Sequence, residues 1–497
     1  MLAEKRYARL PLSCCTLIFL MGLIAIAVRS AAAQSPAESA KTTLTSTLTD
    51  QHDLAVTVYN QNRGLVRDVR RLDLPAGELD LRFMDIAAKV NPATVHIVSL
   101  TTPHDLTVLE QNYEYDLLSP DKLLDKYVGR DVTLVRFQND NNTTKEVDVK
   151  ATLLSDNDSK PVWKVGDQIV TGIGHDRIIF PDLPPNLYSK PTLIWLLTNR
   201  QAGAQTVEAS YLTDDMNWNA DYVLTLGATE KTADLNSWVT VTNNSGAEFR
   251  NAQLQLVAGA VNVVQPPRAF KGVTGGVARA EAVPAPQFAQ ENISEFHLYS
   301  LERRTTLQDN ESKQISLLEA ANFPIEKHYE VNGQSYYYQN AVAPGEPAKD
   351  SIEVHLKFRN SQANSLGVPL PAGTMRVYEA DSKGRLQFVG EDHIDHTPKD
   401  ERLDLHTGNA FDIVEERRQT NFERVDRHTT ESTFEITLRN HKSERVTVEV
   451  NEPFGGDWTV EESSFKYEKT SATSARFAVP VPADGQAVLT YRVRVRW

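Results

Sequence analysis

Apolar and polar residues alternate one by one along much of the chain, most clearly near its end. Phe434, Ile436 and Leu438 are separated by polar residues, and the same rhythm returns over 446–450 and 489–497. A period of two residues is typical of a strand with one face buried and the other in water. Turns rich in Gly, Pro and Asn separate these stretches, as in antiparallel sandwiches. The sequence therefore predicts an all-β protein of tandem antiparallel β-sandwich or barrel domains.

One segment departs from this pattern. Residues 120–127 begin with Pro120 after Ser119 and carry Leu123 and Leu124 on one side. They are predicted to form a short helix with Ser119 as its N-cap and Pro120 in the first turn. Elsewhere helical periodicity is nearly absent. Parallel α/β enzyme frameworks need a helix after nearly every strand, so the pattern excludes them.

The first 33 residues have the order of a secretory signal peptide. Three basic residues precede an apolar run over 14–28, and three alanines end at Ala33. We expect cleavage before Gln34. The apolar run is shorter than the about 20 residues that span a bilayer, which argues against the alternative of an uncleaved anchor. We therefore expect an exported bacterial protein, either periplasmic or extracellular.

Composition shifts along the chain suggest its domains. Residues 34–52 are rich in Ser, Thr and Ala and are predicted to be a flexible tether, because they offer little apolar surface to bury. An N-terminal β-rich domain is predicted over 53–200, a central β-sandwich over 206–407 and an Ig-like β-sandwich over 408–497. Within the central domain, the Gly- and Pro-rich stretch 265–292 is predicted to be a disordered insertion.

The positions of the cysteines and the net charge limit which reactions and partners are expected for the chain. Both cysteines, Cys14 and Cys15, lie inside the predicted signal, so the processed chain would have no disulfide and no thiolate nucleophile. The full chain carries a net charge of −14, and removing a signal of net charge +3 leaves −17. This acidic balance argues against nucleic acid and anionic membrane surfaces as partners. No later segment is apolar enough to span a membrane. We expect no cofactor, because the lone Gly172-x-Gly174 is not followed by a helix.

Acidic residues surround one tryptophan in the middle of the chain. Asp214, Asp215 and Asp221 lie close in sequence to Trp218. Paired carboxylates beside an aromatic ring would suit glycoside hydrolysis or sugar binding. An ordinary loop that enters a strand, with Trp218 as a core residue, accounts for the same pattern, and the sequence favours it.

The densest polar cluster lies over 391–396 and combines Glu391, Asp392, His393, Asp395 and His396. These residue types can bind a divalent metal. However, positions three apart on a strand point to opposite faces, which separates the two histidines. The residues that follow, 397–401, are typical of a hairpin tip. We therefore predict a solvated turn here and no metal site in the chain.

Three consecutive tyrosines, Tyr336, Tyr337 and Tyr338, are predicted to lie on a strand over 336–340 with rings on both faces. At least one ring should be exposed, where it would serve a glycan or a protein partner. A strand covered on both faces explains the three tyrosines equally well. Tyr337, Trp218 and Asp221 are our candidate binding residues, and no catalytic residue is predicted.

Several stretches between residues 206 and 497 resemble a known family. They are Trp218-Asn219-Ala220-Asp221-Tyr222, Leu298-Tyr299-Ser300-Leu301, the run from Leu370 to Tyr378, His396-Thr397-Pro398, Gly408-Asn409-Ala410-Phe411-Asp412 and the late Trp458. Together they resemble the bacterial domain of unknown function 4139, which mucoidy-inhibitor-like proteins share. The resemblance implies a β-rich exported protein with no settled activity, and it implies a turn at His396-Thr397-Pro398. Before residue 206 the chain has no coiled-coil heptads, unlike the mucoidy-inhibitor type, so a function that depends on such a coil is not expected.

These patterns predict a non-enzymatic envelope or secreted protein that binds a protein or a glycan. The alternative is a carbohydrate-active hydrolase that uses carboxylates near Trp218. A purely architectural spacer is a third possibility. An enzyme requires acidic or basic groups that converge in a concave pocket, whereas a binding protein can use a flat face or a sheet edge.

Overall fold

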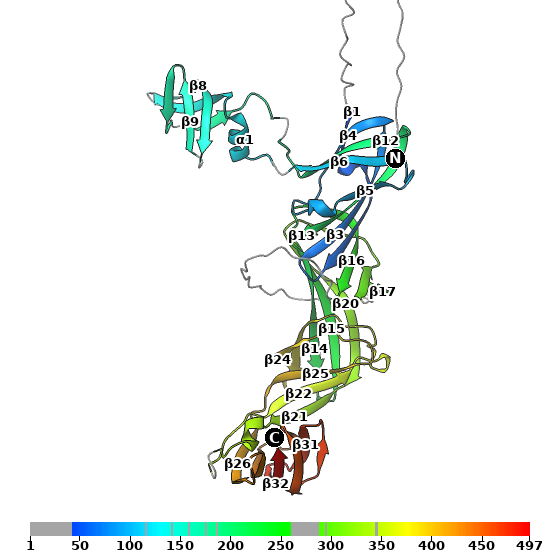
Figure 1. Cartoon of the computed structure of the whole chain (residues 1–497), viewed down its shortest axis with the longest axis vertical. Helices are drawn as coiled ribbons and strands as arrows, with labels where there is room; N and C mark the ends of the chain where they lie inside the picture. The colour runs from blue at the N-terminus through cyan, green and yellow to red at the C-terminus, as the bar shows by residue number, and fades with distance from the viewer. Residues whose placement is uncertain are drawn as a thin grey trace, which may run out of the picture. The chain divides into compact units, whose positions relative to one another are not determined.

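The computed structural model describes residues 42–497 except 115–116, 141–142, 158–159, 174–175, 185–186, 260–287, 294–295 and 343–345. The predicted signal peptide and residues 265–287 of the predicted insertion lie outside the described residues. Nearly all elements are strands, which confirms the all-β prediction (Figure 1). The helix α1 (Pro120–Tyr127) is also confirmed, and the Ser119 side chain caps it by accepting the Lys122 N–H at 3.2 Å. No helix of the described residues has the length and apolar character needed to cross a membrane.

A four-stranded sheet begins the described part of the chain. Its order is β1-β4-β12-β6. The strands are β1 (Thr42–Ser46), β4 (Gly77–Met84), β12 (Thr192–Asn199) and β6 (Leu106–Glu114). Strand β1 pairs in parallel with β4. The tether predicted over 34–52 therefore does not extend over residues 42–52, which belong to β1, the 3-10 turn η1 (Leu48–Asp50) and the start of β2.

An eight-stranded sheet joins strands from both sides of the predicted boundary near residue 200. Its order is β17-β18-β16-β2-β3-β13-β5, and β19 also pairs with β16. The strands are β17 (Phe288–Ile293), β18 (Phe296–Leu301), β16 (Phe249–Ala258), β2 (Gln51–Tyr59), β3 (Arg63–Leu74), β13 (Gly203–Asp214), β5 (His96–Ser99) and β19 (Thr305–Leu307). Because β16 pairs in parallel with β2, the first and second predicted domains share this sheet. Strand β17 occupies residues 288–292, which the sequence had assigned to the disordered insertion.

A small unit is inserted between β6 and β12. These two strands pair antiparallel, so that Glu114 and Thr192 are opposite each other. Between them lie α1 and a sheet of order β10-β9-β8-β7-β11. Its strands are β7 (Asp131–Asp140), β8 (Thr143–Asn157), β9 (Lys160–Val165), β10 (Gln168–Thr171) and β11 (Arg177–Ile179). The unit has its own hydrophobic core around Tyr127, Leu134 and Trp163.

Two further sheets follow. The first has the order β20-β15-β14-β23-β24 and the second β25-β22-β21-β28-β31-β30. Their strands are β20 (Glu311–Pro324), β15 (Thr232–Asn243), β14 (Met216–Leu226), β23 (Gly373–Ala380), β24 (Leu386–Ile394), β25 (Arg402–Asn409), β22 (Glu353–Arg359), β21 (Glu326–Asn332), β28 (Val446–Pro453), β31 (Ser474–Val481) and β30 (Tyr467–Lys469). Two pairs in these sheets, β14–β23 and β21–β28, are parallel, so the architecture is antiparallel only in the main.

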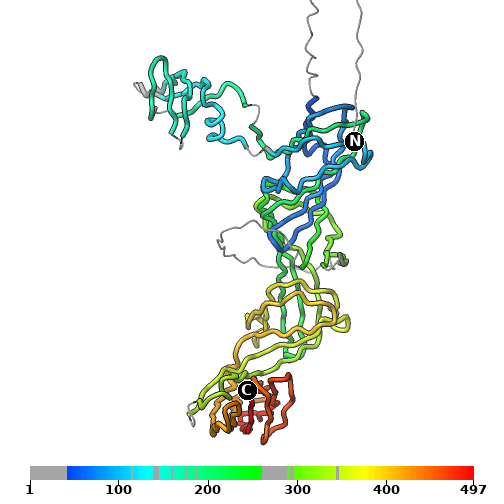
Figure 2. Tube along the Cα trace, viewed as in Figure 1, coloured from blue at the N-terminus to red at the C-terminus, as the bar shows by residue number. Residues whose placement is uncertain are grey.

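The last sheet has the order β26-β27-β32-β29. Its strands are β26 (Ile413–Arg424), β27 (Thr429–Asn440), β32 (Gly485–Arg496) and β29 (Asp457–Ser463). Its inward residues form one core with β28, β31 and β21, which includes Tyr329 and Tyr338 from before residue 408. In Figure 2 the yellow-green segment with β21 accordingly lies beside the orange and red C-terminal strands. A larger core extends from Leu54 to Leu405.

The prediction of a strand over 336–340 is wrong. Residues Ser335–Tyr338 form the 3-10 turn η3, closed by a hydrogen bond from the Tyr337 N–H to the Gln334 carbonyl. A turn places consecutive side chains less than half a revolution apart, and both Tyr337 and Tyr338 are buried in the C-terminal core. Tyr336 is exposed, as the sequence led us to expect for at least one ring. The other 3-10 turns are η2 (Pro92–Thr94) and η4 (Gln362–Asn364).

Candidate functional site

The structure does not bring the three candidate binding residues together. Trp218 lies on β14 with 2% exposure, and its Nε1 donates to the Val257 carbonyl at 3.2 Å. Asp221 lies on the opposite face of the same strand, where Arg376 Nη1 pairs with it at 2.9 Å. Tyr337 is buried in the other core. Trp218 and Tyr337 therefore have core positions, and Asp221 has a cation as partner.

The carboxylates near Trp218 do not form a close pair. Asp215 immediately precedes β14 and Asp221 lies within it. Six residues of extended chain separate them by about 20 Å, whereas the two carboxyl groups of a glycosidase lie roughly 5–10 Å apart. Each also has its own partner: Asn62 Nδ2 donates to Asp215 at 3.0 Å and Thr240 Oγ1 donates to Asp221 at 3.2 Å.

The polar cluster over 391–396 is engaged in backbone contacts. Asp392 accepts the N–H groups of His393 and His406, each at 2.8 Å. Nδ1 of His396 accepts the Ala372 N–H at 3.1 Å, and burial lowers the pKa of His396. The solvated turn predicted over 391–396 is therefore wrong for Glu391, Asp392 and His393, which lie within β24, and the connection to β25 begins only after Ile394.

An apolar pocket of about 450 Å³ lies between β18, β20 and the loop after η4. Its lining is mainly aliphatic and aromatic: Phe288, Tyr299, Leu317, Leu318, Ala320, Ala321, Leu366, Val368 and Pro369, with Gln290, Glu319 and Ser365 as polar members. The Tyr299 hydroxyl donates to the Pro369 carbonyl at 3.0 Å and so ties the loop to β18. Burial raises the pKa of Tyr299, which keeps this donor protonated. The pocket has the size and chemistry of a site for an apolar ligand group.

Trp218 does not line this pocket but packs against Tyr299, which does. Its ring packs edge-on against Tyr299, with centroids 6.4 Å apart. The sequence prediction therefore selected a residue behind the pocket and missed the pocket itself. Its walls come from three regions of the chain: Phe288, Gln290 and Tyr299 from the first, and residues of 317–321 and 365–369 from the others. No local pattern in the sequence connects them.

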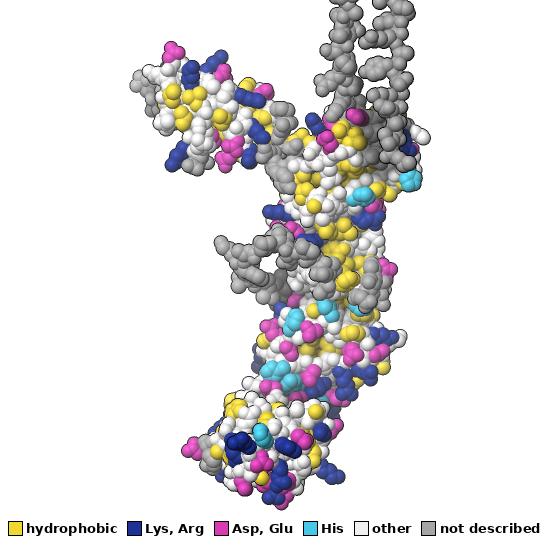
Figure 3. Space-filling view, in the orientation of Figure 1, with side chains coloured by type: hydrophobic (Ala, Val, Ile, Leu, Met, Phe, Trp, Pro, Cys, Tyr) yellow, Lys and Arg dark blue, Asp and Glu magenta, His cyan; other side chains and the backbone are white. Residues whose placement is uncertain are grey.

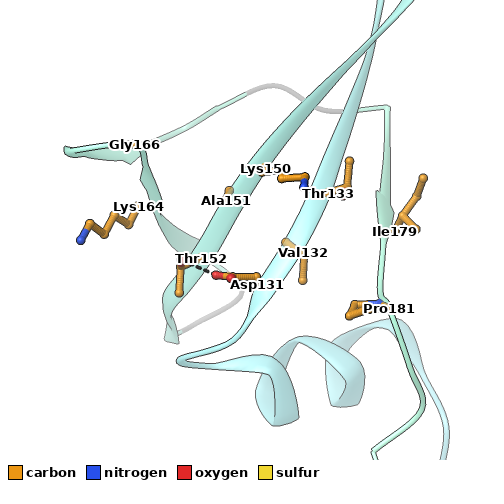
Figure 4. Close-up of a pocket in the computed structure, with 10 residues that line it drawn as sticks. All are labelled: Asp131, Val132, Thr133, Lys150, Ala151, Thr152, Lys164, Gly166, Ile179 and Pro181. Carbon is orange, nitrogen blue, oxygen red and sulfur yellow. Dashed lines mark hydrogen bonds between the residues drawn. The ribbon is translucent and has the colours of Figure 1, made fainter.

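A second, more open pocket of about 550 Å³ lies on the sheet of the inserted unit. Figure 4 shows Asp131 and Thr152 side by side on β7 and β8, with Lys164 directed away from them. Thr152 Oγ1 donates to Asp131 at 2.6 Å. This surface is polar and shallow compared with the pocket at Tyr299.

One face of the sheet β25-β22-β21-β28 carries a ladder of charged and histidine side chains. Nζ of Lys357 lies 2.6 Å from Glu330 and 3.0 Å from Asp404. Nδ1 of His355 lies 2.8 Å from Asp404, and Nδ1 of His328 lies 2.8 Å from Glu449. Burial alone would raise the pKa of Glu330, but the hydrogen bond and charge of Lys357 lower it below its ordinary value. Figure 3 shows histidines among acidic and basic side chains over this part of the chain.

A second polar network is enclosed in the C-terminal core. Arg417 on β26 donates to Glu452 at 2.6 Å, and its Nε lies 3.3 Å from Glu415. Tyr338 also donates to Glu452, and its hydroxyl oxygen lies 2.8 Å from that of Tyr491. Burial raises the pKa of Glu415 to about 7. The charge of Arg417 lowers this pKa only in part, so burial leaves Glu415 with a tendency to hold a proton.

A family model described as "Domain of unknown function (DUF4139)" matches residues 207–497, more than half of the chain. The chain belongs to this family. No curated protein matches the chain.

The pocket at Tyr299, the ladder and the buried Arg417 network all lie in the DUF4139 region, and the inserted unit lies outside this region. In this chain the DUF4139 strands β13 and β16 pair with the earlier strands β3 and β2, so the region shares its sheet with the preceding residues.

Proposed function

We propose that the chain is an exported, non-enzymatic binding protein of the cell envelope or the secreted fraction. Its ligand is an extended peptide segment of a partner protein, and the pocket at Tyr299 takes an apolar side chain of that peptide. Export rests on the signal-like order of the first 33 residues. The observation that carries the binding role is the combination of this pocket with a sheet edge at its rim.

The sheet edge is strand β17. Among the described residues β17 pairs with β18 alone and ends the eight-stranded sheet. Phe288 and Gln290 of β17 also line the pocket. A strand at a sheet edge offers backbone N–H and C=O groups to an extended peptide, and a neighbouring pocket then selects alternate side chains.

The lining favours an apolar side chain over a sugar. The Tyr299 hydroxyl is engaged with Pro369, and Gln290 Nε2 lies 2.9 Å from a ring nitrogen of His297. Aliphatic atoms of residues such as Leu318 and Val368 make up most of the wall. Glycan binding and hydrolysis both need several polar groups that converge on the ligand.

The test begins with an immobilised library of random nonapeptides, from which binders are selected and measured by calorimetry. Val368→Asp places a charge at the pocket rim at a position that is 40% exposed, so the fold should tolerate it. We expect it to weaken peptide binding at least tenfold. Val425→Asp, at a comparably exposed valine outside the pocket lining, is the matched control and should bind as the wild type does.

Hydrogen exchange supplies the second measurement. A bound peptide that extends the sheet should slow exchange at the amides of β17. The proposal fails if no peptide is selected, if Val368→Asp binds normally, or if a glycan array yields a ligand whose binding depends on Val368.

A further inference from the structure

We propose that His328, Glu330 and Glu449 form a site for one divalent transition-metal ion, of which Zn²⁺ is the best match. The three residues lie on the neighbouring strands β21 and β28, which pair in parallel with Glu330 opposite Glu449. His328 is two positions before Glu330, so all three side chains project from one face of the sheet.

Their spacing fits a common ion. One donor atom from each residue lies within 4.8 Å of the other two. Zinc bonds to imidazole nitrogen and carboxylate oxygen are about 2.0–2.2 Å long, so two ligand atoms of a tetrahedral ion are roughly 3.4 Å apart. A small rotation of the side chains would therefore close the site. An imidazole with carboxylates is a donor set that suits zinc and manganese.

The surroundings resemble the outer shell of a metal site. Nε2 of His328 lies 3.4 Å from Glu326, while Nδ1 faces Glu449 at 2.8 Å. A carboxylate on one ring nitrogen orients the imidazole and leaves the other nitrogen for the ion. Arg476 Nη1 lies 3.3 Å from the second oxygen of Glu449, and Asn451 Nδ2 donates to Glu330 at 3.0 Å. Both ligand carboxylates are therefore held in place from outside the site.

The charge of the ladder favours a bound cation. Its acidic members outnumber its permanent cations: they are Glu326, Glu330, Glu353, Asp404 and Glu449, against Lys357 and Arg476. A dication would offset most of this excess. The Glu330 and Glu449 side chains are 12% and 14% exposed, so water screens them less than it screens a surface carboxylate.

A second triad in the ladder shows why we assign one ion. Glu330, His355 and Asp404 meet the same distance limit. Here, however, the Lys357 ammonium group lies 2.6 Å from Glu330 and 3.0 Å from Asp404, where a metal would otherwise neutralise them. Lys357 thus contacts both carboxylates of the second triad but only Glu330 of the first, so the second triad is the more fully neutralised, and His355 provides a matched control for His328.

The experiment is calorimetric titration of the full chain with Zn²⁺, and separately with Mn²⁺ and Mg²⁺. We expect one Zn²⁺ site, at least tenfold weaker in His328→Ala and in Glu449→Gln, and within twofold of the wild type in His355→Ala. Lys357→Met should strengthen Zn²⁺ binding, because it removes the ammonium group that neutralises Glu330. Circular dichroism of each variant checks that the sheet persists.

Three results would overturn the assignment. They are the absence of a Zn²⁺ site in the wild type, Zn²⁺ binding that survives His328→Ala unchanged, and equal losses in His328→Ala and His355→Ala. Zn²⁺ should also raise the melting temperature of the wild type and leave that of Glu449→Gln nearly unchanged, because a ligand that binds the folded state stabilises it.

Discussion

Arg417 donates to Glu452 at 2.6 Å inside the C-terminal core, where the two side chains are 2% and 0% exposed. Apart from Glu415 and the hydroxyl groups of Tyr338 and Tyr491, the core around them is apolar and includes Phe434 and Phe454. A buried ion pair is costly to desolvate, and breaking it by removal of one partner typically costs about 3–5 kcal/mol.

Arg417→Met should therefore destabilise the C-terminal core by about 3–5 kcal/mol, because it leaves Glu452 without its cation. The double variant Arg417→Met/Glu452→Gln should recover at least half of this loss. Urea unfolding, with hydrogen exchange at β27 and β32, measures the effect. Arg418→Met is the control: Arg418 is the next residue of β26 and is 40% exposed, so its loss should change stability little. Equal effects of Arg417→Met and Arg418→Met would contradict the role of the buried pair.

Glu415 should make the stability of the same core depend on pH. Its pKa is about 7 in the folded protein, against an ordinary value of 4.5. Between these values the folded state binds more protons than the unfolded state, so stability is greatest below pH 4.5 and falls as the pH rises to 7. The raised pKa corresponds to a loss of roughly 3 kcal/mol at most.

Glu415→Gln mimics the protonated carboxyl and should flatten this part of the profile. Urea midpoints at pH 5 and pH 8 give the measurement. The wild type should lose more stability than Glu415→Gln between these values. Parallel profiles for the two proteins would show that Glu415 does not cause the dependence.

The parallel pairing of β14 with β23 depends on a glycine. A Cβ on Gly373 would lie 2.1 Å from the Ala220 carbonyl oxygen, which belongs to the backbone of the paired strand. Gly373→Ala should therefore cost about 1–3 kcal/mol or more, since the backbone has to move. Gly384→Ala is the comparison: a Cβ there meets nothing within 4 Å, but its φ of +76° favours glycine. We expect a cost of about 1 kcal/mol for it, and a larger fall in melting temperature for Gly373→Ala.

The inserted unit should be removable. Glu114 and Thr192 face each other across the β6–β12 pair, so an Asn-Gly turn can replace residues 115–191. Because the unit has its own core, the shortened chain should keep the β6–β12 pairing and fold with a melting temperature close to that of the full chain. Amide exchange in β6 and β12 provides the check. Loss of protection in both strands would mean that the unit stabilises the sheet that carries it.

The sequence predicted several local features well. The alternation of Phe434, Ile436 and Leu438 identified β27 and its buried face, and Ser119-Pro120 identified the start of α1. The same alternation of side chains along a strand also indicates that Trp218 and Asp221 lie on opposite faces, although we listed both as candidate binding residues. The alternation did not apply at Tyr336–Tyr338, where a tight turn directs neighbouring rings into one core.

The alternation of side chains is a property of each strand, so the sequence by itself determined that the protein is β-stranded and which residues of a strand face inward. Only the tertiary structure decided which strands become neighbours. The pairing of β2 with β16, the alignment of Glu330 with Glu449 and the walls of the pocket at Tyr299 all join segments far apart in the chain. Such contacts depend on how whole sheets pack and share cores, and the period of a single strand carries no information about its partner.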